Sequence, residues 1–370
     1  MNLLPLTNPT WGLSIFEDAL CFVEIKKGWR HRSFQQLKRI PLPSGTLKLS
    51  SAKPNILQTA EFIALLRQTS QALSTPLPVA LSLPDLCART SIFDFSQFPK
   101  KARDQRALLN WRFQQDLKLD TSHSRLTYGT YVPLPRPETP SLPQPDRVQV
   151  LGAAIRNEIV EQFEHACLEA NLLPVSVGIA GLDIFDLYQS TLQEMLDAEY
   201  RRSPASFPGG LFIYLSQWGF TFLAFKDTSP QFIRTKAINI RKDSSMVDPV
   251  TKAILPSPPL SSSVYPPYTK VKVTKEILAT IQYYLETYPP DDPKPSTINV
   301  FLSTDLDQSS SLLPSAEQLS YTLNACDYPE TILQIIPLSS HDPINPRSTL
   351  SLSDTEAGSA LPGFARLRVA

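Results

Sequence analysis

Two similar sets of short strands, far apart in the chain, constrain the fold more than any other feature. Each set reads as three successive strands joined by short turns; the ranges are residues 11–16, 19–26 and 31–41, and residues 211–216, 220–226 and 231–240. An amphipathic helix and a short apolar strand follow each set, over 56–73 and 78–83, and over 274–288 and 297–303. This pattern indicates an α/β protein with two lobes, each a mixed sheet covered by helices.

The length of 370 residues agrees with two lobes, because one hydrophobic core stops growing at roughly 250–300 residues. Between the meanders, strand-like and helical stretches read as a small α+β subdomain inserted in the first lobe. The expected boundaries are 1–10 for an N-terminal tail, 11–84 and 147–205 for the first lobe, 85–146 for the inserted subdomain, 206–338 for the second lobe and 339–370 for a C-terminal tail.

Composition excludes several classes of protein. Lys plus Arg equals Asp plus Glu at 35 each, so no net field draws the chain to nucleic acid. The cysteines form no C-x-x-C pair and the histidines have no metal-ligand spacing, which argues against a metal or redox site. The N-terminus lacks the features of a secretion signal, and no apolar run approaches the roughly 20 residues that span a bilayer. We therefore expect a soluble, cytoplasmic protein that reaches a membrane only through a partner.

Three carboxylates recur on the helix expected over 182–200, namely Asp183, Asp186 and Glu194. They lie opposite the apolar side of that helix, and such residues usually form its solvent-facing side. The sequence therefore predicts no paired-acid mechanism from them.

The chain resembles the PilM-like type IV pilus assembly proteins, a branch of the actin-like ATPase superfamily. The residues that carry the resemblance are Gly12 to Ile15, Val23 to Lys26, Trp111 to Asp116, Val148 to Arg156 and Glu164 to Ala170. The resemblance implies a two-lobed actin-like, or ribonuclease H-like, fold with a small subdomain in the first lobe. It also implies a site for ATP and magnesium between the lobes, with two phosphate loops formed by the tight turns of the meanders.

The first of these loops departs from the family's Asp-x-Gly-type pattern. Ser14 stands for the aspartate that would hold the magnesium shell, and Phe16 stands for the glycine. Glu17 and Asp18 follow, and Glu17 adds negative charge beside the place where phosphates would lie. The bulky ring and the added charge argue against phosphate binding.

The second loop departs in the same way. Tyr214 and Ser216 occur in the run where another Asp-x-Gly is expected, and only Gly219 and Thr221 remain suggestive. The Gly-Gly of the adenosine side is also missing from residues 301–306. Because phosphoryl transfer depends almost entirely on such positioning, we expect a pseudo-ATPase without a cofactor; weak nucleotide binding stays open.

The first residues suggest a partner. In pilus systems resembling this one, the PilM-like protein binds a short cytoplasmic tail of its membrane partner PilN, and that tail carries an Asn-Leu-Leu-Pro element. The same letters begin this chain, as Asn2, Leu3, Leu4 and Pro5. One hypothesis is that this tail docks into a groove of its own or a neighbouring copy. The alternative is a coincidence of four common residues.

These observations favour an interaction protein over an enzyme. The expected role is a scaffold or adaptor of a type IV pilus or related secretion machine, peripheral to the inner membrane through a PilN-like partner and able to form a homo-oligomer or ring. The alternative is an active ATPase or kinase of the actin superfamily with atypical phosphate loops. A third interpretation, the cytoplasmic domain of a GspL-like secretion protein, would need a membrane helix after the domain, and none follows residue 303.

Overall fold

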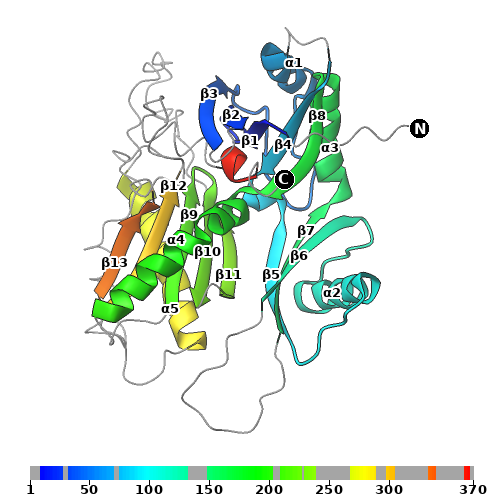
Figure 1. Ribbon diagram of the computed structural model, residues 1–370. Coiled ribbons are helices and arrows are strands. Elements are labelled where there is room, and N and C mark those ends of the chain that lie inside the picture. Colours follow the sequence, from blue (N-terminus) through cyan, green and yellow to red (C-terminus); the bar gives the residue numbers. More distant parts are fainter. Residues whose placement is uncertain are drawn as a thin grey trace, which may run out of the picture.

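The computed structural model describes residues 9–27, 32–70, 75–131, 148–202, 209–226, 229–238, 267–288, 297–304, 332–338 and 362–366. The described chain forms two lobes and a smaller subdomain, each built on its own sheet (Figure 1). The segment that contains Asn2 to Pro5 lies outside the described residues.

The first lobe is a five-stranded sheet with the order β3-β2-β1-β4-β8. Its strands are β1 (Trp11–Ile15), β2 (Ala19–Lys27), β3 (Arg32–Pro41), β4 (Leu77–Leu83) and β8 (Leu172–Ile179). The first three strands are the expected antiparallel meander, and β4 and β8 run parallel to β1. Helices α1 (Thr59–Ser70) and α3 (Asn157–Glu169) supply part of the core on one face. The central strand β1 is buried along nearly its whole length.

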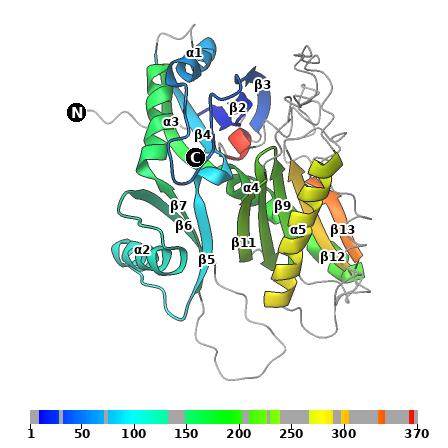
Figure 2. The same ribbon diagram turned by 180° about the vertical axis from the view of Figure 1, so that it is seen from behind.

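The second lobe repeats this topology in the order β11-β10-β9-β12-β13. Its strands are β9 (Gly209–Ser216), β10 (Gly219–Lys226), β11 (Ser229–Ala237), β12 (Thr297–Thr304) and β13 (Ile332–Pro337). Figure 1 shows α4 (Ala180–Arg202) crossing one face of this sheet, and Figure 2 shows α5 (Pro267–Thr287) crossing the other. The expected repetition of the meander is therefore confirmed.

Helix α4 also packs on the first lobe, so it lies between the two large sheets. One core cluster joins residues of β2 and β4 to residues of α4 and of β9, β10 and β12. At its centre the centroid of the Phe185 ring lies 5.5 Å from the centroid of the Phe212 ring and 5.4 Å from that of the Phe225 ring. The two lobes thus share one hydrophobic core rather than meeting at a wet interface.

The subdomain is a three-stranded antiparallel sheet with the order β5-β7-β6. It comprises β5 (Arg89–Phe95), β6 (Ser124–Tyr131) and β7 (Val148–Arg156), with α2 (Ala102–Leu117) packed against it through Leu109 and Phe113. Residues 147–156 were expected in the first lobe, but β7 is the middle strand of this sheet. The boundary therefore lies after Arg156, because strand periodicity shows that a strand exists and does not show which sheet it joins.

The C-terminal segment is a second departure from the expected domains. Residues 362–366 form a short helix, in red in Figure 1, whose Phe364 and Ala365 are buried in the core cluster around α4. A Cβ added to Gly12 on β1 would lie 2.4 Å from the carbonyl oxygen of Gly363, so the two backbones are in direct contact. The described part of the expected C-terminal tail is therefore a structural element between the lobes.

This contact generates a stability prediction. Gly12→Ala should lower the free energy of unfolding by about 1–3 kcal/mol, because the new methyl group meets backbone that cannot rotate away. Urea denaturation measures the change. Gly129→Ala, whose added Cβ would make only ordinary contact with the Tyr131 side chain, is the matched control. If the urea midpoint of Gly12→Ala equals that of the wild type, the C-terminal helix does not pack against β1.

Candidate functional site

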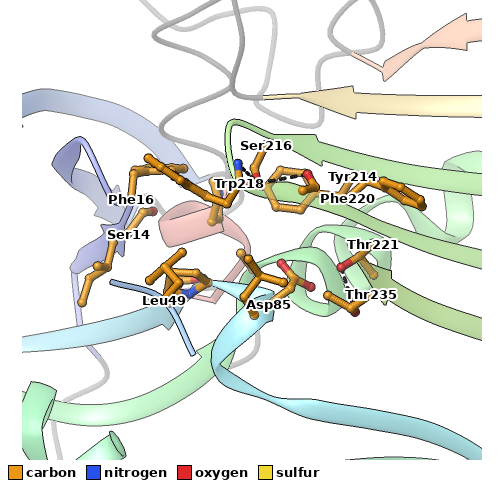
Figure 3. A pocket seen from close by; sticks show the side chains of 17 residues that line it. Ser14, Phe16, Leu49, Asp85, Tyr214, Ser216, Trp218, Phe220, Thr221 and Thr235 are labelled. Atoms are coloured by element: carbon orange, nitrogen blue, oxygen red, sulfur yellow. Dashed lines mark hydrogen bonds between the residues drawn. The ribbon is translucent and has the colours of Figure 1, made fainter. Parts of the chain in front are cut away.

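The turns of the two meanders face each other across a pocket between the lobes (Figure 3). The first lobe contributes the ends of β1 and β4, and the second lobe contributes the ends of β9 and β10. Of the residues expected at the degenerate phosphate loops, the pocket is lined by Ser14, Phe16, Tyr214, Ser216, Gly219 and Thr221. The structure therefore brings together the two loops that the sequence places about two hundred residues apart.

The pocket is small because aromatic side chains fill it. Phe16 is buried, and its backbone N–H donates to the carbonyl oxygen of Ala19 at 2.8 Å, which fixes the first turn tightly. Trp218 and Phe220 line the pocket from the second lobe. The cavity has a volume of about 20 Å³, against the roughly 10–15 Å³ that a single water needs. It has room for one or two waters.

The tips of the two turns are joined by a hydrogen bond. The Gln217 side chain donates to the carboxylate of Asp18 at 3.1 Å, and Arg39 donates to the same carboxylate oxygen at 2.9 Å. The guanidinium of Arg39 also lies 5.9 Å from the centre of the Phe16 ring. Asp18 and the neighbouring Glu17 are half-buried at the tip and do not line the pocket. The Asp18 carboxylate therefore links the first lobe to the second through the side chain of Gln217.

Several polar atoms at the pocket have no hydrogen-bond partner within the described part of the chain. They are the hydroxyl oxygens of Ser14 and Ser82, both residues only 1% exposed, and the indole nitrogen of Trp218. Ser14 and Ser82 are register partners on the parallel strands β1 and β4.

Asp85 is the charged residue of the pocket that sequence reasoning missed. It begins the short 3₁₀ helix η1 (Asp85–Cys87) directly after β4 and is 9% exposed. Its carboxylate accepts the backbone N–H of Gly181, at 3.0 and 3.2 Å, and points toward Thr221 (Figure 3). Burial raises the pKa of Asp85 to about 6, although the neighbouring Thr221 and Gly181 oppose the shift.

Asp183 was expected on the solvent-facing side of its helix, and that prediction was wrong. The side chain is buried in the first turn of α4, and Arg366 of the C-terminal helix lies 3.2 Å from its carboxylate. Arg366 also donates to the hydroxyl of Ser176 at 2.7 Å. Burial raises the pKa of Asp183 to about 7, and Arg366 opposes the shift. Helical periodicity could not reveal a partner that lies far along the chain.

The other two carboxylates of that helix, Asp186 and Glu194, are exposed.

The sequence did contain a signal for Asp85, which is its position at the end of a buried strand. Leu83 ends β4, Ile179 ends the parallel neighbour β8, and the C-terminal ends of adjacent parallel strands form the crevice where open α/β sheets bind ligands. Asp85 and Gly181 follow these two ends and meet there.

No cluster of metal-ligating side chains occurs within the described ranges, and no helix among these residues is long and apolar enough to cross a membrane.

The chain has the actin-like fold. Its two lobes have the same strand order, and a pocket lies between them where their meander turns meet. The resemblance drawn from the sequence is confirmed at the level of the fold.

Comparison with solved structures gives the particular likeness. A chain from a structure described as a PilM-PilN type IV pilus biogenesis complex matches with a TM-score of 0.63 at 15% identity, over 98% of this chain and 97% of that chain. The cytoplasmic domain of EpsL from the Vibrio cholerae type II secretion system matches with a TM-score of 0.43 at 7% identity, over 95% and 93%. A Bacteroides thetaiotaomicron protein with an actin-like ATPase fold matches with a TM-score of 0.41 at 11% identity, over 97% and 99%. No family model and no curated protein matches the sequence.

The raised pKa of Asp85 generates a prediction for pH dependence. The folded state holds this proton up to about pH 6, whereas the unfolded state releases it near 3.8, so stability falls as the pH rises through this window. Between about pH 4 and about pH 7 the loss should be roughly 2 kcal/mol. Asp85→Asn should remove that part of the slope in urea denaturation series.

The exposed Asp104 provides the control, because Asp104→Asn should leave the slope as it is in the wild type. The account of Asp85 fails if Asp85→Asn and the wild type lose stability in parallel as the pH rises.

Proposed function

We propose that the chain is a scaffold or adaptor of a type IV pilus or related secretion machine, and that it works by docking partners rather than by hydrolysing ATP. The observation that carries the proposal is the pocket between the lobes, which Phe16, Trp218 and Phe220 reduce to about 20 Å³. A nucleotide needs a pocket of at least roughly 300 Å³. The fold match to a chain of a PilM-PilN complex supports the pilus role.

The chemistry of the loops supports the absence of hydrolysis. A phosphate loop needs backbone N–H groups that approach the phosphates and a carboxylate that holds the magnesium shell. At the first loop, a buried phenyl ring occupies the gap and Ser14 is the polar side chain at the end of β1. The nearby carboxylate, Asp85, already accepts the backbone N–H of Gly181. In this proposal the fold is kept as a rigid platform.

The proposed partner is the cytoplasmic tail of a PilN-like inner-membrane protein, through which this chain is held, peripherally, at the cytoplasmic face of the membrane. The Asn2 to Pro5 element is proposed to act as an internal competitor for the same groove, in the same or a neighbouring copy of a homo-oligomer or ring. An extended peptide of this kind suits a groove, because leucines fill apolar pockets and proline lowers the ordering cost.

Calorimetric titration with Mg-ATP tests the proposed loss of the nucleotide site. We expect no measurable heat of binding, because the phosphate position is filled by the Phe16 ring and the cavity has no room for the nucleotide. The competing function, an ATPase with atypical loops, predicts micromolar affinity together with phosphate release. That result would replace the scaffold proposal.

Deletion of residues 1–8 tests the proposed competition. Titration of a synthetic peptide with the sequence of the PilN-like cytoplasmic tail should show tighter binding to the deletion variant than to the full chain, because the internal competitor is gone. Sedimentation of both proteins reports on oligomerisation. Unchanged oligomerisation together with unchanged peptide affinity would contradict the competitor hypothesis, and absence of any peptide binding would contradict the proposed partner.

A further inference from the structure

The first-lobe sheet has a patch of small residues on one of its faces. Two rows of register partners across β1, β4 and β8 form it, and they are Gly12, Ala80 and Ser176, and Ser14, Ser82 and Gly178. Residues two apart along a strand point to the same face, so these six residues, none larger than serine, lie side by side. A polypeptide backbone can therefore approach the sheet closely at this small-residue patch.

A segment of the chain's own C-terminus lies on this patch. It is the helix of residues 362–366, in red against the first-lobe sheet in Figures 1 and 2. A Cβ on Gly12 would lie 2.4 Å from the carbonyl oxygen of Gly363, and a Cβ on Gly363 would lie 2.9 Å from the hydroxyl oxygen of Ser14. Both positions need glycine, because a side chain at either one would hold the two backbones apart.

The last residue of this helix, Arg366, is held by polar contacts. Its guanidinium donates to the hydroxyl of Ser176 at 2.7 Å and to the buried carboxylate of Asp183 at 3.2 Å. Its Cδ atom lies where Gly178 has no side chain, since a Cβ there would be 2.4 Å away. The patch and the start of α4 thus recognise a cation in addition to a closely packed backbone.

Phe364 and Ala365 add to the core between the lobes without being its foundation. They are 2% and 0% exposed and belong to the core cluster around α4. Every other buried member of that cluster precedes residue 339. The lobes therefore share an apolar core to which the C-terminal helix contributes only these two side chains.

Two buried hydroxyls at the patch are left unpaired by its occupant. The hydroxyl oxygens of Ser14 and Ser82 have no hydrogen-bond partner among the residues that the structure describes, although both residues are only 1% exposed. Polar groups inside a fold are normally paired. The fit between the patch and the helix is therefore less complete than the packing of the surrounding core.

The connection to this helix differs from that of the corresponding helix in the first lobe. There α4 begins at Ala180, directly after β8 ends at Ile179. In the second lobe, Leu338 and the helix are separated by residues 339–361, which lie outside the described residues. Leu338 and Phe364 belong to one core cluster, whereas a connection of this length can reach roughly 75 Å. The covalent connection therefore does not fix the helix in place, and its contacts must do so.

We propose that the small-residue patch is a peptide-binding site and that residues 362–366 are its tethered ligand. The site takes a short peptide with a glycine that meets the sheet, an aromatic residue directly after it and an arginine two positions further on. The ligand can leave and return while the lobes keep their shared core, and a free peptide of the same sequence can take its place. This site goes beyond the proposed pilus role and does not depend on it.

Peptide exchange tests the site with every residue of the chain present. A protease recognition sequence inserted after Ser351 allows the connection to be cut once the protein has folded. A fluorescein-labelled peptide of residues 358–370 should then bind the cut chain, and its anisotropy should rise to saturation. The uncut chain should bind the peptide about a hundredfold more weakly, because a tethered ligand competes at an effective concentration near millimolar.

Changes in the peptide separate recognition from unspecific binding and leave the fold of the receptor untouched. Arg366→Ala in the peptide should weaken binding at least about tenfold, because Asp183 loses its cation. Gly363→Ala should do the same, because the new methyl group meets the hydroxyl of Ser14. A peptide of reversed sequence has the same composition and should not bind.

The receptor offers a matched pair of variants. Ser176→Ala removes one hydrogen bond to Arg366 and should weaken binding roughly threefold to tenfold, whereas Gly129→Ala on β6 should have no effect. Circular dichroism reports whether the cut chain stays folded. Unfolding of the chain on cutting would overturn the proposal. A folded cut chain that fails to bind the peptide, or that binds its Arg366→Ala form equally well, would overturn it too.

Discussion

The structure depends most on the packing of α4 between the two large sheets. Its Phe185 contacts Phe212 and Phe225 of the second lobe, while the same core cluster reaches Cys21 and Val23 of the first. The C-terminal helix completes this core, with Gly363 against the backbone of Gly12. Since the lobes share one apolar core, parting them would expose buried aromatic surface. The closed arrangement is therefore the ground state of the fold, whatever occupies the pocket.

Aromatic side chains of both lobes line the pocket between the two meander turns and leave a cavity of about 20 Å³. Phe16, which stands where the resemblance implies a glycine, is buried at the pocket, and the N–H of Gly181 at the start of α4 donates to the carboxylate of Asp85. Asp18, at the tip of the first turn, bonds across to Gln217. This bond joins the tips of the two turns across the lobes.

The sequence predicted the parts that depend on local pattern. The repeated meanders, the helices and the meeting of the two loops follow from periodicity and the resemblance, and the structure has them. It did not predict that β7 joins the subdomain sheet, or that Asp183 is buried against Arg366. Those features depend on pairings between distant segments, which one sequence does not display. Asp85 lay in a recognisable place, the end of a parallel strand, but as a lone carboxylate it carried no motif.

Hydrogen exchange at the two meander turns tests the central claim, that the closed arrangement needs no nucleotide. The amides of Phe16, at the β1–β2 turn, and of Ile238, which donates to the Trp218 carbonyl beside the β9–β10 turn, report on the two lobes separately. The account predicts strong protection at both positions in the free protein and no change on adding saturating Mg-ATP. Weak protection that rises at both turns together when Mg-ATP is added would contradict it.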